Sequence, residues 1–104
     1  MISKSIHFTV AEKDSLSFRS ALQQVEEASQ SESGCVYYAA FTEKDNTSEF
    51  TVLEIWDSED SFEAHRQSKH LKDFKKACGD MIIAKTARDL MPLQEGAESA
   101  PGRK

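Results

Sequence analysis

Apolar and polar residues alternate in two different ways near the beginning of the chain. From Ile2 to Val10 they alternate one by one, with Lys4 as the exception, which predicts a half-buried strand. Through residues 15–29 the apolar residues recur at intervals of three and four, which predicts an amphipathic helix. Gly34 follows this segment and is expected to interrupt the pattern.

The middle of the chain predicts a hairpin of two strands. Residues 35–42 are aromatic and small apolar groups up to the final Thr, so they are expected to be covered on both faces. A polar turn with Asp45 and Asn46 at its tip separates them from a second strand at 49–56.

Two short helices are predicted after the hairpin. Asp57 or Ser58 can cap the first of them, over residues 59–66, because short polar side chains accept hydrogen bonds from free backbone N–H groups. Ser68 can cap the second, whose apolar stripe runs through residues 71–81.

A last strand and a tail complete the chain. Residues 82–91 return to strand character, and the Pro, Gly and Ser residues near the end are typical of a frayed terminus. A chain of 104 residues is long enough for one domain. We therefore assign one domain to residues 1–92 and a flexible tail to residues 93–104.

The order of elements is strand, helix, strand, strand, helix, strand, with the second helical segment in two pieces. This βαββαβ order predicts an α+β ferredoxin-like sandwich, an antiparallel sheet with helices on one face. The other face would then meet water, yet the strand at 35–42 is apolar on both sides. We therefore expect a homodimer in which two sheets pack face to face.

Charge and composition limit the classes of binding partner and the cellular location that we expect. The net charge of −5 argues against nucleic acid or an anionic membrane, because both require a basic surface. No apolar run approaches the roughly 20 residues that span a bilayer, and the N-terminus lacks a secretory signal, so a cytoplasmic protein is expected. Cys35 and Cys78 are expected to be reduced core residues.

A candidate pocket follows from the side chains of one strand and one helix. Side chains alternate along residues 49–56, so Glu54 and Trp56 share one face of the sheet. His65 lies three residues after Phe62 on one helix face and is expected to point toward the sheet. An apolar pocket with one imidazole and one carboxylate is typical of a small-molecule site.

Two more positions are candidates for this pocket. Tyr37 and Tyr38 are consecutive and point to opposite faces, so one can line the pocket while the other joins the dimer interface. His70 lies near the start of a helix and is expected to be half-exposed.

Each candidate also has a purely structural interpretation. Trp56 and His65 can be ordinary core residues, the histidine held by a carboxylate or by backbone. Glu54 can pair across the sheet with Lys85 or Arg88 on the last strand.

Metal and nucleotide sites are not expected. His65 and His70 are five residues apart, about 140° around a helix of roughly 3.6 residues per turn, so they are expected to diverge. A third ligand at convincing spacing is absent, and so is a Gly-rich phosphate loop.

Two stretches resemble the antibiotic biosynthesis monooxygenase family, over about residues 2–92. The stretch EIWDSEDSFEAHRQSKH at 54–70 is similar to the family's strand-to-helix signature. Glu32, Gly34, Cys35 and Tyr38 fit the pattern of its second strand. The resemblance implies a ferredoxin-like dimer with sheets packed face to face.

The resemblance also implies a function: the protein would be a cofactor-independent monooxygenase that oxidises a small phenol or hydroquinone with molecular oxygen. His65 would be the base and Glu54 would orient it or a substrate hydroxyl. The substrate-binding candidates are Trp56, Phe62, Tyr38 and His70. Haem-degrading members use an Asn on the first strand and a His on the last helix, and neither is found here. The alternative is a small-molecule-binding protein or an isomerase of the same dimeric fold.

Overall fold

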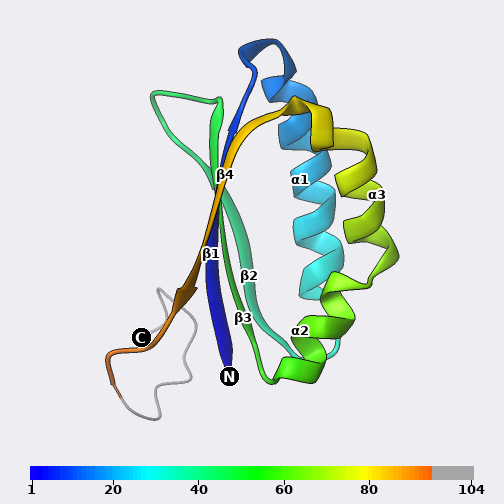
Figure 1. The fold of residues 1–104 in the computed structure, drawn as a ribbon, viewed down its shortest axis with the longest axis vertical. Helices are drawn as coiled ribbons and strands as arrows, with labels where there is room; N and C mark the ends of the chain where they lie inside the picture. Colours follow the sequence, from blue (N-terminus) through cyan, green and yellow to red (C-terminus); the bar gives the residue numbers. More distant parts are fainter. Residues whose placement is uncertain (95–104) are drawn as a thin grey trace.

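The computed structural model describes residues 1–94 and has the expected ferredoxin-like α+β fold. Four strands form one antiparallel sheet, and the helices cover one of its faces (Figure 1). The elements in chain order are β1 (Ile2–Val10), a 3-10 turn (Glu12–Asp14), α1 (Ser15–Gln30), β2 (Cys35–Thr42), β3 (Glu49–Trp56), α2 (Glu59–Arg66), α3 (Lys69–Cys78), a 3-10 turn (Gly79–Met81) and β4 (Ile82–Leu90).

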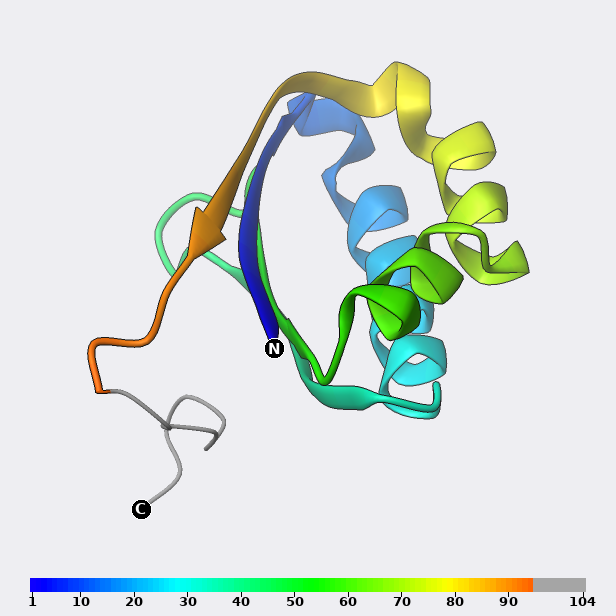
Figure 2. The same ribbon diagram turned by 60° about the horizontal axis from the view of Figure 1, so that its bottom comes forward.

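The sheet has the order β2-β3-β1-β4, so the first strand is central and the last strand forms an edge. In the register of the sheet, Lys4 of β1 lies opposite Glu54 of β3 on one side and Asp89 of β4 on the other. Residues directly opposite each other on neighbouring strands point to the same face of the sheet. Glu54 is buried beneath the helices, so all three side chains lie on the face toward the helices. Figure 2 shows that α1, α2 and α3 all lie on this side.

Phenylalanines fill the core between the sheet and the helices. Phe18 of α1 packs against Phe8, Phe50 and Phe74 with ring centroids 4.9 to 5.4 Å apart. Burying one such side chain contributes about 1.5–3 kcal/mol. This cluster fastens α1 and α3 to one end of the sheet.

A serine side chain caps the N-terminus of each short helix, and the second helix ends earlier than expected. The Ser58 hydroxyl accepts a hydrogen bond from the N–H of Ser61, and Ser68 accepts one from Leu71. Ser68 caps α3 as expected, but the helix ends at Cys78 and gives way at Gly79 to a 3-10 turn, before the end of the expected apolar stripe at residue 81. The last strand ends one residue earlier than expected.

No helix covers the second face of the sheet within residues 1–94 (Figures 1 and 2). Along β2, Tyr38 is buried beneath the helices, whereas Phe41 on the other face is 52% exposed. Leu53 of β3 shares that second face, which we call the open face. Whether a second chain covers the open face stays a prediction.

The helices of residues 1–94 are all too short or too polar to cross a membrane. Most of the expected tail, residues 95–104, lies outside the described residues.

Candidate functional site

A cavity of about 360 Å³ lies between the sheet and the helices α2 and α3. That volume lies in the range of pockets that hold small ligands. Most of its wall is apolar or aromatic, and its polar lining comes from both layers. The side chains that line it include Ile6, Phe8, Val25, Tyr38, Val52, Glu54, Phe62, His65, Leu71 and Phe74.

His65 of α2 and Glu54 of β3 meet in the wall of this cavity. The Nε2 atom of His65 lies 3.8 Å from Oε1 of Glu54, and both side chains are almost fully buried. Phe62, one turn earlier on α2, also lines the cavity, so the face of the helix that carries both side chains points toward the sheet. The expected pairing of one imidazole and one carboxylate in an apolar pocket is therefore present in the geometry.

A second carboxylate, which the sequence did not single out as a site residue, holds the other side of this imidazole. Glu32, between α1 and β2, accepts a hydrogen bond from Nδ1 of His65 at 2.6 Å and one from Nε2 of His70 at 3.0 Å. A carboxylate can only accept, so a neutral His65 carries its proton on Nδ1. Its Nε2 is then a free base beside the cavity.

The loop that carries Glu32 is docked onto the start of α2 through a glycine. Gly34 has a φ of +85°, and a Cβ atom there would lie 2.1 Å from Oγ of Ser61. Only glycine accepts this backbone at such close approach without strain. The N–H of Asp57 also donates to the Gly34 carbonyl at 2.9 Å. In the sequence, Glu32 and Gly34 were named together only as part of the pattern of the family's second strand.

Trp56 lies behind the site and does not line the cavity. Its Nε1 donates to Oε1 of Glu54 at 2.7 Å, and its ring packs 4.5 Å from that of His65. The interpretation in which Glu54 pairs with Lys85 or Arg88 is wrong, because the neighbouring indole takes the carboxylate instead.

Burial changes the acid–base properties of two groups in the cavity wall. Burial raises the pKa of Glu54 above its ordinary value, although the Trp56 hydrogen bond and His65 oppose this. Burial also raises the pKa of the Tyr38 hydroxyl, with the Glu54 carboxylate as the next cause. Tyr38 lines the cavity, whereas Tyr37 points to the open face. Glu54 is thus a weaker acid than an exposed glutamate, and its protonated form can donate a proton.

The two cysteines show no sign of reactivity. Burial raises the pKa of Cys35 to about 11 and also raises that of Cys78, which disfavours the thiolate in both. Both are free thiols, and Cys78 lies in the core whereas Cys35 is partly buried against it.

The expected divergence of His65 and His70 is wrong. They belong to two separate helices, so the angular spacing of one helix does not apply, and their rings lie 6.0 Å apart. Glu32 is the third polar group that the sequence did not reveal. One ligand atom from each residue lies within 4.8 Å of the others, so these three could hold a metal ion. His70 lies beside Glu32 and outside the cavity wall.

The third histidine lies elsewhere. His7 is on the open face, where it bonds to Glu49 at 2.6 Å and to Thr51 at 3.0 Å. With Glu43 and Glu49 it forms a second group of potential ligands, on the opposite side of the sheet from the cavity.

Comparisons with known proteins agree with this architecture. The model of the antibiotic biosynthesis monooxygenase family matches residues 1–77. An antibiotic biosynthesis monooxygenase-like protein from Bacteroides thetaiotaomicron is 24% identical with a TM-score of 0.86 over 92% of each chain. One from Nitrosomonas europaea is 17% identical with a TM-score of 0.85, over 90% of this chain and all of the other. A Mycobacterium tuberculosis protein is 21% identical with a TM-score of 0.82, over 92% and 98% of the two chains. At these identities the likeness shows a shared fold. No curated protein matches the chain.

Proposed function

The chain belongs to the antibiotic biosynthesis monooxygenase family, and on that premise we propose that it oxidises a small phenol or hydroquinone with molecular oxygen without a cofactor. The observation that carries the proposal is the imidazole of His65, whose Nδ1 is held by a carboxylate while Nε2 remains beside an apolar cavity. A base of this kind suits the removal of a phenolic proton.

The reaction joins one hydroquinone and one O₂ to give a hydroxylated quinone and one water. Nε2 of His65 takes a phenolic proton, and the resulting phenolate donates one electron to O₂. The ring radical and superoxide then combine into a C–O bond, and the ring hydroperoxide loses water. All electrons that reduce oxygen come from the substrate, so the proposed chemistry needs neither flavin nor metal.

Three residues of the chain have separate roles in this proposal. Glu32 holds His65 in one tautomer and stabilises the imidazolium that forms when the base takes its proton, as a buried carboxylate does in hydrolytic triads. Glu54, whose pKa is raised by burial, supplies a proton to the departing water. Phe62 packs on the substrate ring, and the apolar wall excludes bulk water from the phenolate.

Oxygen uptake by chelator-treated, flavin-free protein with a panel of hydroquinones tests this proposal. We expect turnover that EDTA leaves unchanged. His65→Ala should reduce kcat by about 10²–10⁴-fold, because a positioned general base contributes that much. His7→Gln serves as the control, because it alters an imidazole on the opposite side of the sheet.

Two outcomes would contradict the proposal. Full activity of His65→Ala would remove its proposed role. Binding of hydroquinones without any oxygen uptake would instead favour a binding protein, and turnover without oxygen would favour an isomerase.

A further inference from the structure

We propose that the cavity selects an aromatic substrate that carries a carboxylate group in addition to its ring hydroxyl. The hydroxyl would lie at the inner end, near His65 and Glu54, and the carboxylate at the mouth, between Lys75 and Lys85. This inference rests on the proposed function for the role of the hydroxyl, but the binding preference itself can be measured without turnover.

The cavity wall is divided by burial into an inner and an outer end. Tyr38, Glu54 and His65 are buried and mark the inner end. Lys75 of α3 and Lys85 of β4 also line the cavity, yet both are exposed, so they mark its mouth. The mouth therefore opens between the helical layer and the edge strand of the sheet.

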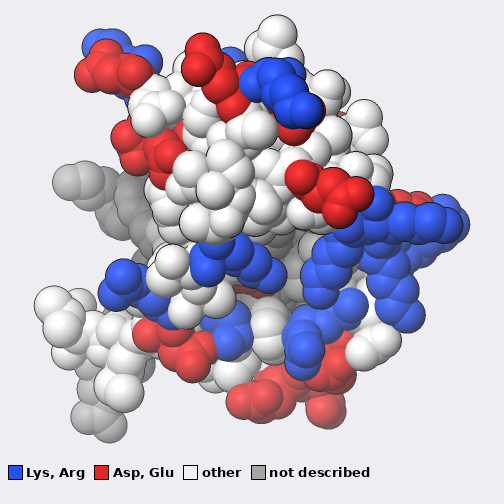
Figure 3. Space-filling view, turned by 45° about the horizontal axis from the view of Figure 1, so that its top comes forward, with Lys and Arg blue, Asp and Glu red and all other residues white. Residues whose placement is uncertain are grey.

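Positive charge gathers at this mouth although the whole chain is acidic. Four of the residues that line the cavity are cationic, in a protein whose net charge is −5. Figure 3 shows lysine and arginine side chains on both sides of a hollow in the surface. A cleft lined by charge of one sign raises the local concentration of ligands of the opposite sign.

Two of the four cations are already paired. Lys4 forms an ion pair with Asp89, and Arg66 forms one with Glu63 at 3.1 Å. Within residues 1–94, no carboxylate lies within 4.0 Å of the ammonium of Lys75 or Lys85. These two lysines approach the mouth from opposite layers and are available to a ligand.

The same charges fix the orientation of the ligand. At the buried inner end an anionic group would lose its hydration beside the acidic side chain of Glu54, whereas a hydroxyl can hydrogen-bond to Glu54 or donate to Nε2 of His65. An acid group is therefore excluded from the inner end and attracted to the mouth. The volume of about 360 Å³ accommodates a ring with both substituents.

A matched pair of ligands tests the proposal: 1,4-hydroquinone and 2,5-dihydroxybenzoate, which differ by one carboxylate. Calorimetric titration without oxygen measures binding alone. We expect the acid to bind roughly tenfold more tightly at low salt, since each partly exposed ion pair contributes a factor of about 2–5. The preference should shrink in 0.5 M NaCl through screening.

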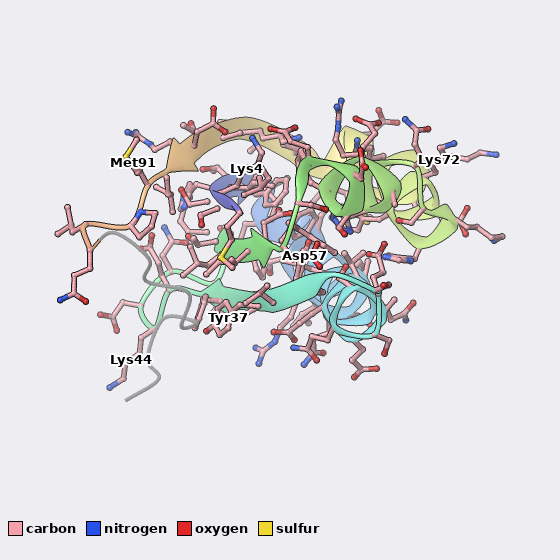
Figure 4. The ribbon with its side chains drawn as sticks, turned by 90° about the horizontal axis from the view of Figure 1, so that it is seen from below. Lys4, Tyr37, Lys44, Asp57, Lys72 and Met91 are labelled. Atoms are coloured by element: carbon pink, nitrogen blue, oxygen red, sulfur yellow. The ribbon has the colours of Figure 1, made fainter. Side chains whose placement is uncertain are left out.

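Two double variants with equal loss of charge separate the mouth from the general field of the protein. Lys75→Gln with Lys85→Gln should abolish the preference for the acid and leave the affinity for hydroquinone unchanged. Lys72→Gln with Lys76→Gln should keep the preference, because neither residue lines the cavity. Figure 4 shows Lys72 on the outer side of α3, away from the sheet.

The inference is overturned if the acid binds no more tightly than hydroquinone or not at all, or if both double variants lose the preference equally. Its failure differs from failure of the proposed function. Oxygen uptake without a preference for the acid would support the oxygenase activity and contradict the carboxylate-binding site. A lysine-dependent preference without oxygen uptake would support the carboxylate-binding site and contradict the oxygenase activity.

Discussion

At the scale of single residues, the imidazole of His65 lies between two carboxylates with different surroundings. Glu32 lies partly at the surface and accepts a hydrogen bond from Nδ1 directly, whereas Glu54 is buried and accepts its hydrogen bond from Nε1 of Trp56. Burial raises the pKa of Glu54. Pairs of carboxylates in unlike environments are a common basis for separate acid and base roles.

The raised pKa of Glu54 predicts how stability depends on pH. The folded protein retains this proton to a higher pH than the unfolded chain does, so the associated stability is present below about pH 4, the ordinary range of Glu. It is lost as the pH rises through the raised pKa. Glu54→Gln keeps an acceptor for Trp56 but does not titrate.

We therefore expect Glu54→Gln to gain stability relative to the original protein as the pH rises above about 4. Urea unfolding at several pH values measures this difference in the free energy of unfolding. A difference that stays constant over the whole range would contradict the assignment of a raised pKa to Glu54.

At the scale of elements, the site depends on how the loop between α1 and β2 meets the start of α2. The loop carries Glu32 and the helix carries His65, and Gly34 is the point of closest approach. The short helix alone would position His65 poorly, since a helix of eight residues has little stability of its own. Its serine cap and the docked loop supply the constraint.

Gly34→Ala should lower the free energy of unfolding by about 2–4 kcal/mol, because a left-handed backbone costs about 1–3 kcal/mol and the new Cβ meets Ser61. Gly79→Ala is the matched control. A Cβ there meets nothing within 4 Å, and the backbone has helical angles. Chemical denaturation of both variants checks this, and equal effects would contradict the docking role of Gly34.

At the scale of the whole molecule, the sheet has one face covered by helices and one open face. Leu53 and Phe41 lie on the open face, and burying such apolar side chains in a second copy would remove them from water. A single small domain has a limited core, so pairing would add to its stability.

We expect sedimentation equilibrium to give twice the mass of one 11.7 kDa chain. Leu53→Asp should lower that mass to one chain, because it places a charge in the centre of the proposed interface. Leu16→Asp, on the exposed outer side of α1, should leave the mass unchanged. A single-chain mass for the unaltered protein would contradict the homodimer.

The order and type of the helices and strands, and the shared face of Glu54 and Trp56, were predictable from the residue pattern. Periodicity reports which side of a strand or helix meets the core, and this holds before any contact between elements is known. It also brought His65 to the correct side of its helix, because Phe62 marks that side.

The contacts between side chains of different elements depend on how those elements pack, which the residue pattern does not specify. Glu32 and His65 are 33 residues apart, and their contact depends on how one loop docks onto one helix. His65 and His70 converge because α2 ends at Arg66 and α3 begins at Lys69, so the two side chains are not related by the spacing of one helix. Trp56 lies behind the cavity, because its hydrogen bond to Glu54 and its packing against His65 hold the indole outside the cavity wall. The free volume itself is a difference between large packed volumes, and no local pattern specifies it.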